Sequence, residues 1–287
     1  MTDTASTQPV RAIDAWVNVN MGELGMADYM RAAAKDVFKS GEDYWRNMSV
    51  AETLAMMDEL GVERALLMSD ADAPSKHVLA FPEAAPERFA LAAKVDPRRG
   101  VAALRELASY ARSEPVVLAC VTPFTVGLAP SDRAYFPLYS ACIELGLPLA
   151  LTTGIPGPPA PAHVQDPLHL DDVCLAFPEL TLVMAHGADP WWDVAIRLML
   201  KYPRLHLMTS AYLPKYLPAS LLHFMRTRGA DRVIYASDHP AIPMKRCLDE
   251  ARKLDLPAAV LERYLHGNAA RVFARAQPDF TISYLKC

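Results

Sequence analysis

The sequence predicts an α/β fold, a (β/α)8 TIM-type barrel, because eight short apolar runs rich in β-branched residues alternate with longer amphipathic stretches. The apolar runs lie at residues 12–19, 64–68, 89–95, 116–121, 147–151, 180–185, 205–208 and 232–236. Helical patterns lie at residues 51–60, 100–112, 134–145, 170–177, 191–201, 218–228 and 243–254. Apolar strands separated by helices form a parallel sheet covered on both faces. Eight such repeats favour a closed barrel over an open sheet.

The length and composition agree with one barrel domain. The chain has 287 residues, of which 52% are hydrophobic and 22% charged, so it can bury a large core. A barrel needs roughly 250 residues plus insertions. We therefore expect a single domain over residues 1–287, with its core at about residues 11–275.

Two segments stand outside the alternation of strands and helices. Residues 21–46, after the first strand, are too many for a strand–helix loop and predict a helical insertion over the barrel mouth. Residues 154–167, after the fifth strand, are rich in proline, which excludes a helix or a central strand there. Both insertions follow strands, so both are expected on the functional face.

Charge and cysteine usage exclude several classes of partner. The formal net charge is −4 and there is no basic run, so neither nucleic acid nor a membrane surface is expected as a partner. No apolar stretch reaches the ~18 residues of a membrane span. The five cysteines are widely spaced and odd in number, which indicates reduced thiols and a cytoplasmic protein.

The candidate site residues are polar or aromatic side chains at the ends of the predicted strands, where barrel enzymes place their chemistry. Two of them, His186 and Asp238, follow apolar runs and can transfer protons or bind a metal. The further candidates for substrate binding are Trp16, Asn18, Thr152, Ser210, His239 and Trp191. Hydroxyl groups at strand ends also commonly satisfy loop amides, and adjacent tryptophans also commonly pack or form subunit interfaces.

Four segments, at residues 13–18, 182–187, 232–240 and 267–273, resemble the amidohydrolase-related branch of the amidohydrolase superfamily. This branch includes aminocarboxymuconate-semialdehyde decarboxylase, resorcylate decarboxylase and pyrone dicarboxylate lactonase. The resemblance extends in order from residue 12 to residue 273. It implies the barrel fold, and homodimerisation is expected at the level of the family.

The resemblance also implies metal ligands that this sequence mostly lacks. It implies a His-x-His pair on the first strand, where Trp16 and Asn18 stand, and a histidine on the fifth strand, where Thr152 stands. Only His186 and Asp238 match the implied ligands, and a catalytic zinc site normally keeps three protein ligands. We therefore expect no metal and no other cofactor. The alternative is a divalent metal, zinc or manganese, at His186 and Asp238.

On these grounds the expected function is that of a metal-independent, lactonase-like hydrolase acting on a small, fairly apolar ester, lactone or related carbonyl compound. Asp238 is expected to be the general base, as the lactonase branch implies, and His186 the acid or the polarising group. Two alternatives stay open: a divalent-metal-dependent decarboxylase of an aromatic or keto acid, and a barrel that binds a ligand without catalysis.

Overall fold

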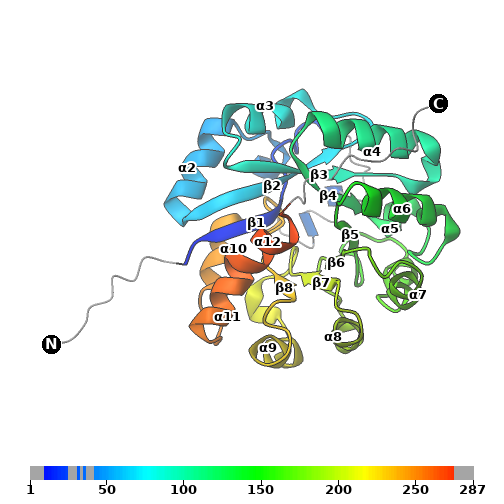
Figure 1. The fold of residues 1–287 in the computed structure, drawn as a ribbon. Coiled ribbons are helices and arrows are strands. Elements are labelled where there is room, and N and C mark those ends of the chain that lie inside the picture. The colour runs from blue at the N-terminus through cyan, green and yellow to red at the C-terminus, as the bar shows by residue number, and fades with distance from the viewer. Residues whose placement is uncertain (1–9, 25–30, 33–34, 37–41, 275–287) are drawn as a thin grey trace.

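In the computed structural model, which describes residues 10–24, 31–32, 35–36 and 42–274, eight parallel strands form one sheet in sequence order (Figure 1). The strands are β1 (Ala12–Val17), β2 (Val62–Asp70), β3 (Phe89–Lys94), β4 (Val116–Val121), β5 (Leu149–Thr152), β6 (Leu182–Ala185), β7 (Leu205–Met208) and β8 (Val233–Ile234). A parallel bridge between Val17 and His239 joins β1 to the segment after β8 and closes the ring. The prediction of a TIM-type barrel is confirmed.

The helices surround the ring of strands (Figure 1). They are α2 (Val50–Leu60), α3 (Lys76–Ala84), α4 (Val101–Ser113), α5 (Pro123–Val126), α6 (Phe136–Glu144), α7 (His169–Ala176), α8 (Trp192–Lys201), α9 (Ala219–Arg226), α10 (Met244–Ala251), α11 (Ala258–Glu262) and α12 (Asn268–Val272). All seven predicted helices are present. Helix α3 was not predicted, because it is short and contains Pro82, which normally ends a helix.

The barrel interior is filled by apolar side chains that alternate along the strands with those facing the helices. Inward positions include bulky residues such as Leu118 and Met208 and small ones such as Ala92, Ala150 and Ala236. A strand turns successive side chains to opposite faces, so Lys94, two positions after Ala92 on β3, also faces inward. Lys94 ends β3 and Asp238 lies in the loop after β8, and both line the mouth of the barrel.

Helix α12 packs against the other end of the barrel. Its residues Val272 and Ala269 belong to the interior apolar cluster. The Asn268 side chain donates hydrogen bonds to the carbonyls of Ala230 and Val233, at 3.0 and 2.8 Å. These bonds fix α12 to the beginning of β8. Because this end is packed, access to the interior is left to the opposite end, where the strands finish.

Both predicted insertions contribute to the mouth of the barrel. Much of the insertion at residues 21–46 lies outside the described residues, but Met21, Leu24 and Tyr44 line the mouth. The Pro-rich loop lines it too, and the Gln165 side chain donates to the carbonyl of Gly154 at 2.8 Å, which fastens the two ends of the loop together. No helix among the described residues is long and apolar enough to cross a membrane.

Candidate active site

A cavity of about 390 Å³ opens at the carboxyl ends of the strands. Its apolar lining includes Trp16, Phe124, Ile155, Pro156, Pro158 and Tyr212. The charged or titratable side chains of Lys94, His186 and Asp238 also line the cavity. Tyr44 adds a further aromatic ring to the lining. Catalytic groups in barrel enzymes lie at this end. A small, flat and largely apolar ligand with a few polar groups suits such a cavity.

Three non-glycine residues adopt left-handed backbone conformations in the loops that follow consecutive strands. His186, Ala211 and Asp238 follow β6, β7 and β8 with φ values of 63°, 64° and 64°. Such a conformation costs about 1–3 kcal/mol per residue and persists where the surrounding structure enforces it, commonly at functional sites. Two of the three residues carry the titratable groups of the cavity, which supports a functional role for these turns.

The imidazole of His186 is held from below by Ser210. The Ser210 hydroxyl oxygen accepts the backbone N–H of His186 at 3.0 Å and lies 2.8 Å from Nδ1 of the same residue. A hydroxyl group can donate its own hydrogen or accept a second one, so this contact is compatible with both tautomers; when the Ser210 hydroxyl donates to Nδ1, the ring hydrogen lies on Nε2. Burial lowers the pKa of His186 to about 4. At neutral pH this residue is therefore an uncharged hydrogen-bond donor.

The indole of Trp16 packs edge-on against His186, with 4.7 Å between the ring centroids. This contact fixes the plane of the imidazole, and the Ser210 bond fixes its rotation. The two contacts together leave Nε2 as the ring nitrogen available to a ligand.

The surroundings of the Asp238 carboxyl group favour its protonated form. Burial raises its pKa well above 3.8, and the nearby charge of Asp14 raises it further. Its hydrogen bond with a side chain is donated by Asn18 Nδ2 to Oδ1 over a long 3.4 Å. The side chain is half-buried, and it lines the cavity. A carboxyl group that keeps its proton in such a place can act as a general acid.

The structure brings together four of the eight predicted site residues: Trp16, Asn18, His186 and Asp238 line the cavity. The other four predicted residues do not line the cavity. Thr152 is buried and donates to Gln165 Oε1, and Ser210 lies beneath His186. His239 accepts the N–H of Met244 at 3.3 Å through Nδ1, and its Nε2 lies 3.0 Å from Met48 Sδ. Trp191 precedes α8 outside the cavity.

Several residues that line the cavity are not among the eight predicted site residues. Lys94 ends an inward-facing series on β3, and this alternation was the signal that could have identified it. Thr153, not Thr152, reaches the cavity. Tyr44, Gln165 and Tyr212 come from loops or insertions, where no periodic pattern indicates which side chains point inward.

Solved structures with the same fold include two decarboxylases. An uncharacterised TIM-barrel protein from Bordetella bronchiseptica has a TM-score of 0.76 at 24% identity, covering 92% of this chain and 99% of its own. The 5-carboxyvanillate decarboxylase from Sphingomonas paucimobilis has a TM-score of 0.71 at 20% identity, with the same coverage. A dihydroxybenzoic acid decarboxylase from Polaromonas, solved with manganese and 2-nitroresorcinol, has a TM-score of 0.66 at 16% identity, covering 92% and 97%. At these identities the likeness establishes the fold.

These comparisons contradict two expectations drawn from the sequence, a metal-independent hydrolase and the absence of any cofactor. The neighbours are decarboxylases, and some of them were crystallised with manganese. The alternative, a decarboxylase, agrees with them better. Both expectations relied on counting the implied histidines that Trp16, Asn18 and Thr152 replace. That count neglects that manganese also takes oxygen ligands from water and carbonyl groups, and that loss of histidines does not select hydrolysis.

The donor groups of the described residues do not by themselves form a complete metal site. Among the residues that the structure describes, no group of three or more His, Cys, Asp or Glu side chains could hold a metal ion. The cavity offers His186 and Asp238, and His186 uses Nδ1 to bond with Ser210. We therefore assign no chemical step to a metal ion and derive the chemistry from the side chains.

Family membership rests on the sequence as a whole. A comparison with curated proteins finds no match. The family model described as "Amidohydrolase", in contrast, matches residues 13–275, from the first strand to beyond the last helix. This range contains all eight strands and the cavity with His186 and Asp238. The chain belongs to the amidohydrolase family.

Proposed function

We propose that the protein is a carboxy-lyase that removes the carboxyl group of a phenolic aromatic acid. The observation that carries this proposal is the carboxyl group of Asp238, whose pKa is raised by burial, on the wall of a largely apolar cavity. Decarboxylation of an aromatic ring requires a proton at the carbon that loses CO₂. A carboxyl group whose pKa is raised by burial is suited to supply it.

The reaction begins with the substrate as a phenolate whose carboxylate is ortho to the phenolic oxygen. Asp238 donates its proton to the ring carbon that bears the carboxylate, which gives a cyclohexadienone and leaves Asp238 as a carboxylate. The bond from that carbon to the carboxylate then breaks, and its electron pair restores the aromatic ring and the phenolate. CO₂ departs, and Asp238 regains a proton from water.

His186 and the apolar walls support these steps. The Nε2 hydrogen of neutral His186 is suited to donate to the phenolic oxygen, which orients the ring and stabilises the dienone carbonyl. Trp16, Phe124 and Tyr212 provide apolar surface for the flat ring. An apolar environment also favours loss of CO₂, because it solvates the charged carboxylate poorly and the neutral product well.

The test is an assay of a panel of phenolic acids, including 2,6-dihydroxybenzoate and 5-carboxyvanillate, with MnCl₂ supplied throughout so that a shortage of metal cannot limit turnover. We expect CO₂ release and, in D₂O, one deuterium at the carbon that carried the carboxylate. Asp238→Asn should abolish both, whereas Asp172→Asn, which removes an exposed carboxylate on α7, should not. Hydrolysis of esters or lactones with no CO₂ from any acid would overturn the proposal.

A further inference from the structure

We propose that Lys94 binds a second anionic group of the substrate, one that stays on the ring after CO₂ is lost. This inference rests on the proposed function and narrows its substrate class to aromatic acids with two anionic substituents. It starts from the position of Lys94, which lines the cavity of about 390 Å³ and also an adjoining one of about 260 Å³. Thr122 and Thr125 line both cavities as well, so Lys94 stands at their junction.

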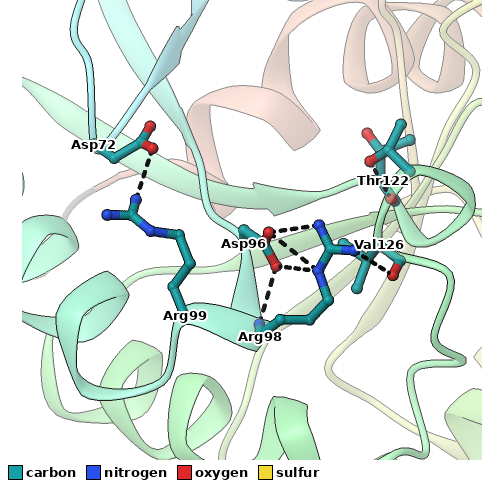
Figure 2. Close-up of polar contacts among 7 residues, drawn as sticks. Asp72, Asp96, Arg98, Arg99, Thr122 and Val126 are labelled. Atoms are coloured by element: carbon teal, nitrogen blue, oxygen red, sulfur yellow. Dashed lines mark hydrogen bonds and ion pairs between the residues drawn. The ribbon is translucent and has the colours of Figure 1, made fainter.

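The ammonium group of Lys94 is the cation available to a ligand at this junction. Among the described residues that line the larger cavity, Lys94 is the one lysine or arginine. The adjoining cavity also contains Arg98 and Arg99, but both are already paired (Figure 2). Arg98 donates to both oxygens of Asp96 and to the carbonyl of Val126, the latter at 3.0 Å.

Arg99 is paired in a similar way. It donates to Asp72 at 2.6 Å and to Glu106 at 2.7 Å (Figure 2 shows the bond to Asp72). For the described residues, by contrast, Lys94 takes part in no ion pair. An anion that reaches the junction therefore meets two neutralised guanidinium groups and one ammonium group without a partner.

Two carboxyl groups lie near this ammonium group. Asp70 is opposite Lys94 in the register of β2 and β3, and Asp238 interacts with it electrostatically across the barrel mouth. Neither forms an ion pair with it. An incoming anion therefore has to approach Lys94 beside Asp70.

The charge balance of decarboxylation decides which anionic group Lys94 should hold. An ammonium group on the departing carboxylate would stabilise the reactant and lose its partner as neutral CO₂ forms, which raises the barrier. On a group that stays charged throughout, the same interaction binds reactant, transition state and product equally. Lys94 is therefore suited to bind a carboxylate that the substrate retains. In this arrangement the ring of the substrate lies between Lys94 and the apolar wall of the cavity.

A matched pair of ligands tests this inference: salicylate and 4-hydroxyisophthalate, which differ by one carboxylate. Their Kd values are measured by tryptophan fluorescence, which does not need turnover. The unaltered protein should bind 4-hydroxyisophthalate about 10- to 100-fold more tightly, as expected for one charge-assisted hydrogen bond. Lys94→Met should abolish this preference with the Kd for salicylate changed less than about twofold.

Three further variants make the outcome specific. Lys94→Arg should restore part of the preference, and Asp70→Asn should strengthen binding of the diacid. Lys245→Met, which removes an exposed lysine of α10, should change neither Kd. The inference is overturned if the unaltered protein shows no preference for 4-hydroxyisophthalate. It is also overturned if Lys94→Met keeps this preference or raises the Kd of both ligands by the same factor. Because binding is the readout, the preference can hold even if no acid is decarboxylated, which would refute only the proposed reaction.

Discussion

Ser237 donates its backbone N–H and its hydroxyl to the two carboxylate oxygens of Asp14, at 2.9 and 2.5 Å. Asp14 lies on β1 and is fully buried, and Ser237 directly precedes Asp238. The Ser237 hydroxyl oxygen also accepts the N–H of His239 at 3.0 Å. These bonds tie the left-handed turn of Asp238 to the first strand. Asp14 thus positions Asp238 and contributes to the rise in its pKa.

Asp14 should make the stability of the protein depend on pH. Burial raises the pKa of Asp14 from 3.8 to about 6, so the folded state binds the proton more tightly than the unfolded state does. Stability from this group is present at low pH and is lost as the pH rises from about 4 to about 6. At about 1.4 kcal/mol for each pKa unit, the loss is about 3 kcal/mol.

The measurement is urea unfolding of the unaltered protein and Asp14→Asn between pH 4 and pH 7. As the pH rises, the free energy of unfolding of the variant should increase relative to that of the unaltered protein. Asp172→Asn serves as the control and should show a constant difference. If the difference for Asp14→Asn is also constant with pH, the carboxyl group is not held in this way.

Ser210→Ala should lower kcat by about tenfold with little change in KM, because it frees the imidazole of His186 to rotate and to take the other tautomer. The hydroxyl holds Nδ1 at 2.8 Å without itself lining the cavity. Steady-state kinetics on the best substrate of the panel measures the effect. Ser140→Ala on the exposed face of α6 is the matched control. An unchanged kcat in Ser210→Ala would mean that the bond does not orient a working His186.

Gly187→Ala should be strongly destabilising, because Gly187 has a φ of +66° and an added Cβ would lie 2.4 Å from the Trp192 ring. Gly127→Ala is the matched control: its φ is +76° in the left-handed region, but nothing lies within 4 Å of the added Cβ. The control should cost about 1 kcal/mol from backbone strain alone, and Gly187→Ala at least about 2 kcal/mol more. If urea unfolding shows that both variants lose the same free energy of unfolding, the Trp192 ring moves aside freely.

The sequence predicted the barrel well because hydrophobic periodicity reports directly on strands and helices. It predicted the candidate site less well, because a strand end does not reveal which of two adjacent side chains faces the cavity. Asp238 faces it and His239 does not; Thr153 faces it and Thr152 does not. A shift of one residue reverses the facing, and the backbone turns after the strands add a rotation that no pattern encodes.

Other misses came from distance in the sequence. Gln165 and Tyr44 reach the cavity from insertions, where no period applies. The expectation of hydrolysis failed for a different reason, since it inferred a reaction from missing ligands. The raised pKa of Asp238, which favours a proton donor instead, depends on its burial and on the charge of Asp14 nearby.

The pH profile of decarboxylation, with the unaltered protein and Asp238→Asn compared, tests the central claim most directly. Asp238 acts in its protonated form, so kcat should be highest at low pH and fall as the pH rises through the raised pKa of this group. Asp238→Asn should lower kcat by at least about 100-fold at every pH while it still binds salicylate. A kcat that rises over the same pH range, or a variant that keeps most of its turnover, would contradict the assignment of Asp238 as the proton donor.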